Sequence, residues 1–228
     1  MGEVWSIVVA GGLGERFGAP KQFSPLGDRP VLHRAVQACR TVSTGVVLVV
    51  PDELVEFQRR IVDSSGADRV VLGGSTRARS VRCGLKVVPP EAVVIFVHDA
   101  ARPLATPALF DRVLAAVSDG SVAGAVPGIR VHDTIKQVDV GVQGAARRVV
   151  ATPDRRTLVA VQTPQAFRAD ALRSAHHRLP ADEATDDASL VEAMGETVVV
   201  VPGEVTNLKI TAPEDLLTAE RYLARGGD

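Results

Sequence analysis

Short apolar runs alternate with segments of helical spacing along this chain. The runs are nearly continuous and are bounded by glycine, proline or polar residues, which is typical of strands that are buried on both faces. They lie at residues 4–10, 45–50, 93–97, 123–126 and 197–201. Helical spacing is found at residues 31–38, 54–62, 109–117 and 216–223. This alternation predicts a mostly parallel sheet covered by helices on both sides, which is a three-layer α/β/α fold.

Capping signals support two of the predicted helices. Thr106 followed by Pro107 offers an N-cap and a proline at the first helical position. The string Thr211-Ala212-Pro213-Glu214 fits a capping box before the last helix. In open parallel sheets, ligands bind beyond the carboxyl ends of the strands, so we look for candidate chemistry directly after each apolar run.

Residues 131–152 depart from this alternation. Apolar residues at Val131, Ile135 and Val138 precede a turn-rich stretch, and a second apolar pair follows at Val149 and Val150. This pattern predicts a β-hairpin. A long hairpin does not pack easily inside a parallel sheet, so it is either a surface flap or an arm that reaches a second subunit. The pattern alone fits both interpretations equally.

The composition narrows the class of protein. With 228 residues, 46% of them hydrophobic, we expect one domain over residues 1–228. The formal net charge of −1 argues against the positive field that holds a nucleic-acid backbone. Cys39 and Cys83 have neither disulfide nor metal-site spacing, and no apolar run reaches the roughly 20 residues of a membrane span. We therefore expect a cytoplasmic protein that binds small molecules, without nucleic acid or membrane partners.

A glycine-rich stretch follows the first predicted strand. It reads Ala10-Gly11-Gly12-Leu13-Gly14-Glu15-Arg16, and Pro20-Lys21-Gln22 comes shortly after it. Glycine lets backbone N–H groups approach phosphate oxygens, and the cations of Arg16 and Lys21 can neutralise further phosphate charge. The stretch lacks the ending of a Walker loop and the third glycine of the dinucleotide fingerprint. The glycines alone would equally suit a tight turn, but with the two cations they favour a polyphosphate cradle.

The third apolar run ends in an acid and two potential cations, His98, Asp99 and Arg102. Asp99 could hold a magnesium ion or a substrate hydroxyl, and Arg102 could hold phosphate. An ion pair that closes a loop explains the same two residues equally well. His98 is either a packed, hydrogen-bonded side chain or a catalytic one. Thr185-Asp186-Asp187-Ala188-Ser189 precedes an apolar helical stretch and fits a helix N-cap.

Together these strings resemble the 2-C-methyl-D-erythritol 4-phosphate cytidylyltransferase family, over residues 8–217. The matching pieces occur in order along the chain. They are the glycine stretch with Arg16 and Pro20-Lys21-Gln22, Gly73-Gly74 with Arg77 and Ser80-Val81, His98-Asp99-Ala100-Ala101-Arg102-Pro103, Asp133-Thr134-Ile135-Lys136, Thr163-Pro164-Gln165, Thr185-Asp186-Asp187-Ala188-Ser189, and Asn207-Leu208-Lys209-Ile210-Thr211.

The resemblance implies a site for CTP and for a sugar-alcohol phosphate on a Rossmann-like nucleotidyltransferase fold. The nucleotide-binding residues it implies are Ala10, Gly11, Gly12, Gly14, Gly74, Ser75, Arg77 and Ser80. The catalytic cations it implies are Arg16, Lys21 and Lys209. The substrate-binding residues it implies are Asp99, Arg102, Thr134, Arg155, Thr163 and Thr185. It further implies Mg²⁺ held mainly by the CTP phosphates with Asp99 as a candidate ligand, and a homodimer through a protruding β-hairpin arm at about residues 130–153.

Two departures from the family pattern bear on this interpretation. The loop has Gly11 where the family commonly has alanine, and the stretch from Arg16 to Lys21 is short. Arg155 is followed by Arg156, so the phosphate ligand is chosen only by its spacing to Thr163.

Two alternatives also remain, an enzyme acting on ribitol 5-phosphate and a nucleotide-binding regulatory module without turnover. The Ala100-Ala101 pair favours the methylerythritol substrate, and retention of both loop cations favours an enzyme.

Overall fold

The central part of the sheet is parallel. The computed structural model describes residues 2–12, 17–141, 145–179 and 186–225. Strand β1 (Glu3–Val9) lies between β4 (Gly45–Val50) and β6 (Ala92–Asp99), and β5 (Arg69–Leu72) forms the edge beside β4. All of these pairings are parallel, and β4 is buried along its whole length, as its unbroken apolar run predicts.

The other half of the sheet is mixed. Strand β7 (Gly124–Arg130) pairs in parallel with β12 (Val198–Pro202). Between β7 and β6 runs the antiparallel strand β11 (Gln165–Arg168), and β10 (Val159–Val161) continues along the same edge of β7. The mostly parallel sheet is thus confirmed. The sequence did not indicate β10 and β11, because strands this short show no clear periodicity.

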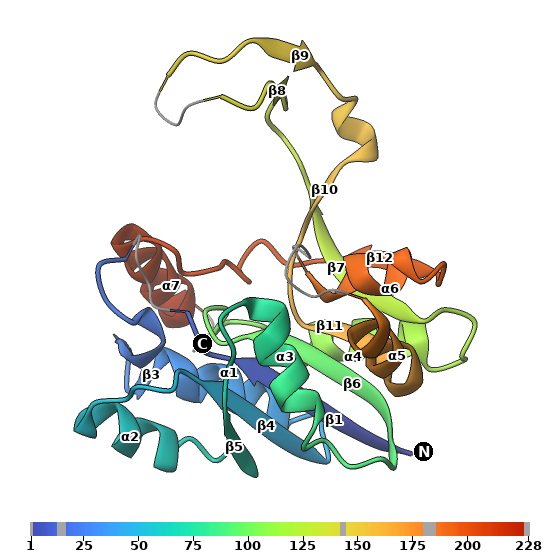
Figure 1. Ribbon diagram of the computed structural model, residues 1–228. Helices are drawn as coiled ribbons and strands as arrows, with labels where there is room; N and C mark the ends of the chain where they lie inside the picture. Colours follow the sequence, from blue (N-terminus) through green and yellow to red (C-terminus); the bar gives the residue numbers. More distant parts are fainter. Residues whose placement is uncertain (1, 13–16, 142–144, 180–185, 226–228) are drawn as a thin grey trace.

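Helices cover both faces of the sheet, which confirms the three layers (Figure 1). One face is covered by α1 (Val31–Arg40), α2 (Glu56–Asp63) and α4 (Pro107–Val117). The opposite face is covered by α3 (Arg77–Leu85), α5 (Ala169–Arg178) and α6 (Asp187–Ala193). On α4, Leu109, Phe110 and Val113 are fully buried, and each contributes about 1.5–3 kcal/mol through burial.

The predicted helix starts agree with the structure in one case and differ in the other. Thr106 caps α4 by accepting from the Leu109 N–H, with Pro107 at the first position. For α7 (Pro213–Arg225), the acid that accepts from the Thr211 backbone and hydroxyl is Asp215 rather than Glu214. In the described part of the chain, no helix combines the length and apolarity that a membrane crossing requires.

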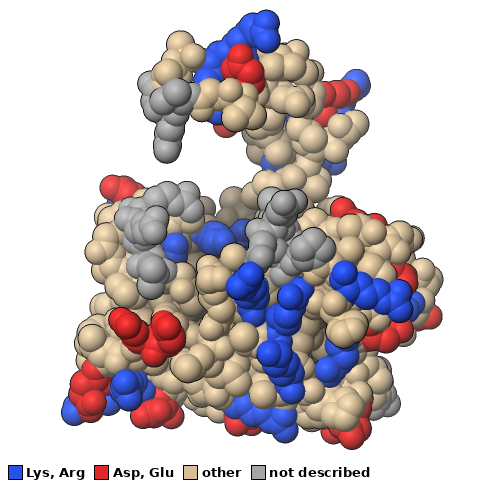
Figure 2. Space-filling model, viewed as in Figure 1, with Lys and Arg blue, Asp and Glu red and all other residues tan. Residues whose placement is uncertain are grey.

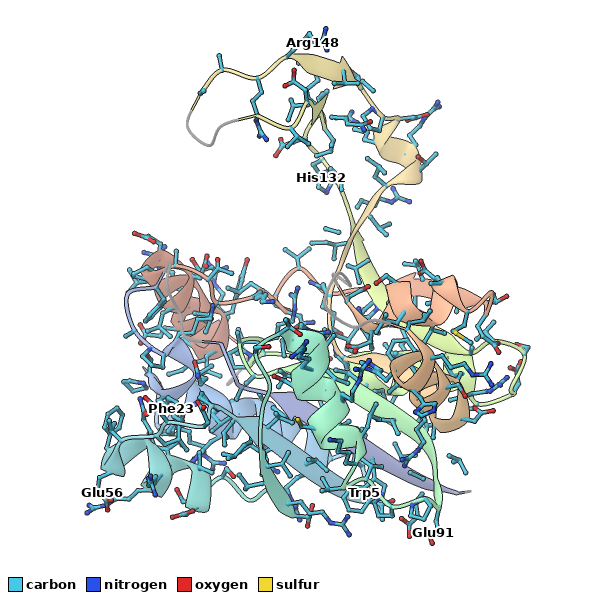
Figure 3. All side chains as sticks on the ribbon, in the orientation of Figure 1. Trp5, Phe23, Glu56, Glu91, His132 and Arg148 are labelled. Carbon is cyan, nitrogen blue, oxygen red and sulfur yellow. The ribbon has the colours of Figure 1, made fainter. Side chains whose placement is uncertain are left out.

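The predicted hairpin is an arm that projects from the body of the molecule (Figure 1). Its strands are shorter than the sequence pattern implied. In the part of the arm that the structure describes, β8 (Gln137–Val138) pairs with β9 (Val149–Ala151) near the tip. The antiparallel pair of β7 and β10 forms its base, and the short helix η2 (Arg155–Thr157) lies on the returning limb. His132 lies near the neck and Arg148 near the tip (Figure 3).

Three small elements connect the glycine stretch to α1. The helix η1 (Lys21–Phe23) is followed by a two-stranded ribbon of β2 (Pro25–Leu26) and β3 (Arg29–Pro30). Leu26 belongs to a third apolar cluster, in which Ile210 and Ala219 of the C-terminal region are also buried. This cluster holds the segment before α7 next to the segment after the glycine stretch.

Candidate active site

The register of the two central strands brings the first candidate residues together. Val9 at the end of β1 lies beside Asp99 at the end of β6. The Ala10 N–H donates to Val49 O at 2.8 Å, and the Ala100 N–H donates to Val9 O at 3.0 Å. A cavity of about 450 Å³ opens beyond these strand ends, where ligands of open α/β sheets bind. Figure 2 shows Lys and Arg side chains in the hollow beneath the arm.

The glycine stretch forms one wall of the cavity, and a buried glutamine fixes its shape. Gln22 is 3% exposed, and its Nε2 donates to the carbonyl oxygens of Ala10 (2.8 Å) and Gly12 (3.1 Å). Both carbonyls of the stretch are therefore hydrogen-bonded within the protein. Lys21, the residue before Gln22, lines the same cavity.

The first turn of α3 and the glycine pair before it also line the cavity. Ser80 Oγ accepts from the Gly74 N–H at 3.1 Å and donates to Thr76 O at 2.9 Å. A Cβ atom at Gly74 would lie 2.5 Å from Arg79 Cβ, so only glycine fits this approach. The side chain of Thr76 caps α3 by accepting from the Arg79 N–H. Gly74, Ser75 and Ser80 all line the cavity, and Ser80 holds the Gly74 N–H in place.

A cluster of charges forms the floor of the cavity. Asp99 accepts from Arg77 Nε at 3.2 Å through Oδ1 and from Lys209 Nζ at 2.7 Å through Oδ2. Burial by itself would raise the pKa of Asp99, but the positive charges of Arg77 and Lys209 outweigh it and hold that pKa well below its usual range. Asp99 is therefore an anion that orients two cations at the cavity.

A buried hydrogen-bond chain supports Asp99 from below. Thr163 Oγ1 accepts from the Asp99 N–H at 3.0 Å and lies 3.1 Å from His98 Nδ1. The other ring nitrogen of His98 lies 3.1 Å from Arg102 O, which can only accept, so Nε2 carries the proton and Nδ1 accepts from Thr163. Burial lowers the pKa of His98 to about 4. His98 is thus a neutral, packed side chain, which settles the two alternatives left by the sequence.

Arg102 and Asn207 connect this hydrogen-bond chain to the segment before α7. Arg102 Nη1 donates to Asn207 O at 2.7 Å, and Asn207 Nδ2 donates to Thr163 O at 2.9 Å. Arg102 is engaged with main-chain carbonyls rather than in an ion pair with Asp99. Neither Arg102 nor Thr163 is among the described residues that line the cavity, so their predicted contact with substrate phosphate stays a prediction.

The described residues do not form a protein cage for Mg²⁺. Among them, no group of three or more His, Cys, Asp or Glu side chains is placed to hold a metal ion. Asp99 is the predicted ligand, and both of its oxygens already accept from Arg77 and Lys209. Asp99 alone cannot complete a magnesium site, so the prediction that the CTP phosphates hold most of the ion, with Asp99 as a candidate ligand, stays a prediction.

The structure places most of the predicted residues around one cavity. The predicted residues that line it are Ala10, Gly11, Gly12, Lys21, Gly74, Ser75, Arg77, Ser80, Asp99 and Lys209. Thr134 and Arg155 lie on the arm, and Arg155 Nη1 donates to His132 O there. Gly14, Arg16 and Thr185 lie outside the described residues.

Sequence reasoning did not assign roles to Gln22, Asp187 or Asn207. Gln22 stands inside the matched string Pro20-Lys21-Gln22, but nothing in that string distinguishes a loop anchor from a surface amide. Asp187 had the signature of a helix cap, whereas the cap of α6 is Asp186 and Asp187 is fully buried. Arg77 Nη1 donates to Asp187 Oδ2 at 2.6 Å, a partner that a separation of 110 residues hides from sequence inspection.

The chain is similar to known proteins over nearly its whole length. The sequence profile of the 2-C-methyl-D-erythritol 4-phosphate cytidylyltransferase (IspD) family matches residues 4–225. A protein of that description from Frankia casuarinae is 45% identical over 226 residues, covering 97% of this chain and 82% of the relative. One from Streptomyces avermitilis is 44% identical over 230 residues, covering 96% and 91%.

Solved structures give the same result. The crystal structure of 2-C-methyl-D-erythritol 4-phosphate cytidylyltransferase from Thermus thermophilus matches with a TM-score of 0.76 and 34% identity, covering 96% of this chain and 98% of that chain. The crystal structure of 4-diphosphocytidyl-2C-methyl-D-erythritolsynthase from Anaerococcus prevotii has a TM-score of 0.80 and 29% identity, covering 97% and 98%. Sequence, fold and cavity agree, and the chain belongs to the 2-C-methyl-D-erythritol 4-phosphate cytidylyltransferase family.

Proposed function

We propose that this chain transfers the cytidylyl group of CTP to 2-C-methyl-D-erythritol 4-phosphate and releases pyrophosphate. The observation that carries the proposal is the convergence of three phosphate-binding features on one cavity. They are the glycine stretch, the ammonium groups of Lys21 and Lys209, and the guanidinium of Arg77. Donors and cations that converge in this way suit a polyphosphate.

The reaction needs no protein nucleophile. A phosphate oxygen of the sugar alcohol attacks the α-phosphorus of CTP, a new P–O bond forms, and the bond from the α-phosphorus to the bridging oxygen breaks to release pyrophosphate. Because negative charge builds up on the phosphate oxygens, positioning and charge neutralisation dominate the rate. Lys21 and Lys209 line the cavity and are suited to this neutralisation.

Asp99 acts on the reaction through the groups that it holds. Its carboxylate fixes the Lys209 ammonium at 2.7 Å and the Arg77 guanidinium at 3.2 Å. A cation held in place needs little reorganisation as the transition state forms, which is the main advantage of an enzyme site over water. When Mg²⁺ is bound to the triphosphate, it supplies further charge neutralisation at the phosphate oxygens.

The arm supports a homodimer with shared sites. Thr134 and Arg155 are predicted to bind substrate, yet both lie on the arm rather than at this chain's own cavity. The arm also exposes apolar side chains, with Val149 52% and Val150 57% exposed, and exposed apolar surface of this kind marks an interaction site. A second subunit would cover these residues and bring its own Thr134 and Arg155 to the cavity. Both cysteines are free, which suits a protein of the reducing cytoplasm.

A turnover screen tests the proposal directly. Each of the four nucleoside triphosphates is incubated with the protein, Mg²⁺ and either 2-C-methyl-D-erythritol 4-phosphate or ribitol 5-phosphate, and pyrophosphate release is measured. We expect turnover with CTP and the methylerythritol phosphate only, because polar groups that match the cytosine edge are left unpaired by a purine. Equal use of ATP or GTP would contradict the proposal. Faster turnover with ribitol 5-phosphate would identify ribitol 5-phosphate as the substrate. CTP binding without any product would indicate a regulatory module.

A further inference from the structure

A second group of buried polar side chains lies behind Arg77, on the side away from Asp99. Asp187 begins α6, and His176 lies in the last turn of α5. The two side chains are 0% and 2% exposed, and His176 Nε2 lies 2.9 Å from Asp187 Oδ1. Neither residue is among the described residues that line the nucleotide cavity. Among the described residues, their hydrogen bonds reach the cavity through Arg77.

Arg77 is held at two corners of its guanidinium group. Nε donates to Asp99 at 3.2 Å, and Nη1 donates to Asp187 at 2.6 Å. Because the guanidinium is planar and rigid, two anchors on different edges fix both its position and its plane. Burial alone would lower the pKa of Arg77, but Asp187 and Asp99 together raise it, so Arg77 carries its charge at the cavity wall.

The anchor behind Arg77 depends in turn on His176. A fully buried carboxylate needs hydrogen-bond donors on both oxygens, and Asp187 receives them from Arg77 on Oδ2 and His176 on Oδ1. Without His176, Oδ1 loses its donor. Arg77 Nη2 is buried and has no hydrogen-bond partner among the described residues. A rotated Asp187 carboxylate could therefore take both Nη groups of Arg77, as carboxylates commonly do, and draw the guanidinium away from Asp99.

We propose that His176 is a positioning residue for nucleotide binding, which acts through Asp187 to fix the guanidinium of Arg77 in the wall of the cavity. The inference rests on the proposed function in taking CTP as the nucleotide. It adds two residues, His176 and Asp187, that are not among the described residues lining the cavity. Their effect is transmitted by hydrogen bonds from α5 and α6 to α3.

Two amide substitutions at residue 176 separate positioning from packing. In His176→Gln, the amide nitrogen can take the place of Nε2 and donate to Asp187. In His176→Asn, the amide nitrogen is near the place of Nδ1 and falls short of Asp187. We expect His176→Asn to raise KM and Kd for CTP about tenfold, which corresponds to one lost hydrogen bond to a charged group. We expect kcat to change less than about threefold and His176→Gln to restore KM to within about threefold, because the lost interaction is made in the ground state.

His177→Asn is the matched control. His177 lines the same hollow between α3 and α5 as His176 but is exposed, so KM for CTP should not change. A readout without nucleotide is the Nε–H signal of Arg77 in ¹⁵N NMR, which should shift in His176→Asn and stay near its wild-type position in His176→Gln. If wild-type protein does not bind CTP, the proposed function fails, while the Arg77 signal still tests the hydrogen-bond relay.

A folded His176→Asn protein with unchanged KM for CTP and an unchanged Arg77 signal would overturn the inference. If that variant does not fold, Asp187→Asn takes its place, because a neutral amide holds the Arg77 cation less firmly than the carboxylate does. A raised KM for CTP would again support the inference. An unchanged KM in Asp187→Asn would overturn it.

Discussion

Lys21 occupies the first position of η1, where its chain continues directly into the buried Gln22 that anchors the glycine stretch. This location places an ammonium group in the cavity with little contribution to the core. We expect Lys21→Ala to lower kcat about a hundredfold, by analogy with loss of one donor to developing charge. Its melting temperature should stay within a few degrees of wild type. Lys86→Ala on the exposed end of α3 is the control, and wild-type kinetics in Lys21→Ala would remove Lys21 from the mechanism.

His98, which is hydrogen-bonded to Thr163 behind Asp99, should make the stability of the protein depend on pH. Burial lowers its folded pKa to about 4, whereas an unfolded histidine titrates near 6.5. As the pH falls, the unfolded chain therefore takes up the proton first. The stability that neutral His98 contributes is complete above pH 6.5 and is lost between pH 6.5 and 4, by about 3 kcal/mol in total.

Urea unfolding between pH 7 and 4.5 measures this effect. His98→Gln should be less stable than wild type at pH 7, and its free energy of unfolding should fall less steeply with decreasing pH. The control is His177→Gln, which changes an exposed histidine and should keep the wild-type slope. The same slope in His98→Gln and wild type would show that folding does not lower the pKa of His98.

At the scale of the elements, the two glycine segments of the cavity differ in whether a larger residue would fit: Gly11 leaves room for a Cβ atom, and Gly74 does not. A Cβ at Gly11 would lie 3.5 Å from Ser80 Oγ, an ordinary contact, and Gly11 does not have a positive φ. A Cβ at Gly74 would lie 2.5 Å from Arg79 Cβ. The departure of Gly11 from the alanine common in the family is thus a matter of chain entropy rather than of fit.

We expect Gly11→Ala to stabilise the protein by about 0.4–1 kcal/mol, because alanine restricts the unfolded chain. Activity should stay within about threefold of wild type, since the backbone N–H is retained. Gly74→Ala is the matched comparison and should destabilise the protein and reduce CTP binding. Both free energies are read from denaturant unfolding, and a destabilised Gly11→Ala would mean that the loop conformation differs from the one described.

The sequence was most informative where an element is long and buried. The apolar run at residues 45–50 coincides with β4, and the run at residues 93–97 lies within β6. Helix α3 was missed because its first turn carries Arg77 and Arg79, although Thr76 is a good N-cap. The strand-end rule brought Gly11 and Asp99 to one cavity, because parallel strands end at the same edge. The Asp187 partner of Arg77 could not be predicted, because α3 and α6 are far apart in the sequence and meet only in the folded protein.

At the scale of the whole molecule, the arm raises the question of which chain completes each site. If the arms exchange in a dimer, Arg155 of each chain serves the cavity that contains the partner's Lys21. We expect a mixture of Arg155→Ala and Lys21→Ala proteins, each nearly inactive, to regain activity when subunits exchange. In a mixed dimer one site carries both lesions and the other carries neither, so about half of the mixed dimers' sites should work.

Independent evidence of exchange, such as native mass spectrometry of differently tagged chains, is the control for this mixture. Activity that stays at the sum of the two mutants despite exchange would mean that each chain supplies its own complete site. Deletion of the arm tip should then leave turnover unchanged. With shared sites, the same deletion should abolish turnover and yield a monomer.

The ion pair between Lys209 and Asp99 can form only after residue 209 has been synthesised. Its partners are 110 residues apart, and Asn207 beside Lys209 ties the same late segment to Thr163. During synthesis, the residues of β1, β4 and β6 leave the ribosome well before residue 209, because the chain emerges from its N-terminal end. The nascent chain therefore lacks one cation of the cavity floor until Lys209 has been synthesised and can reach Asp99. We therefore expect chains that end before Lys209 to be inactive, even where β1, β4 and β6 have paired, because Asp99 then lacks one of its two cations.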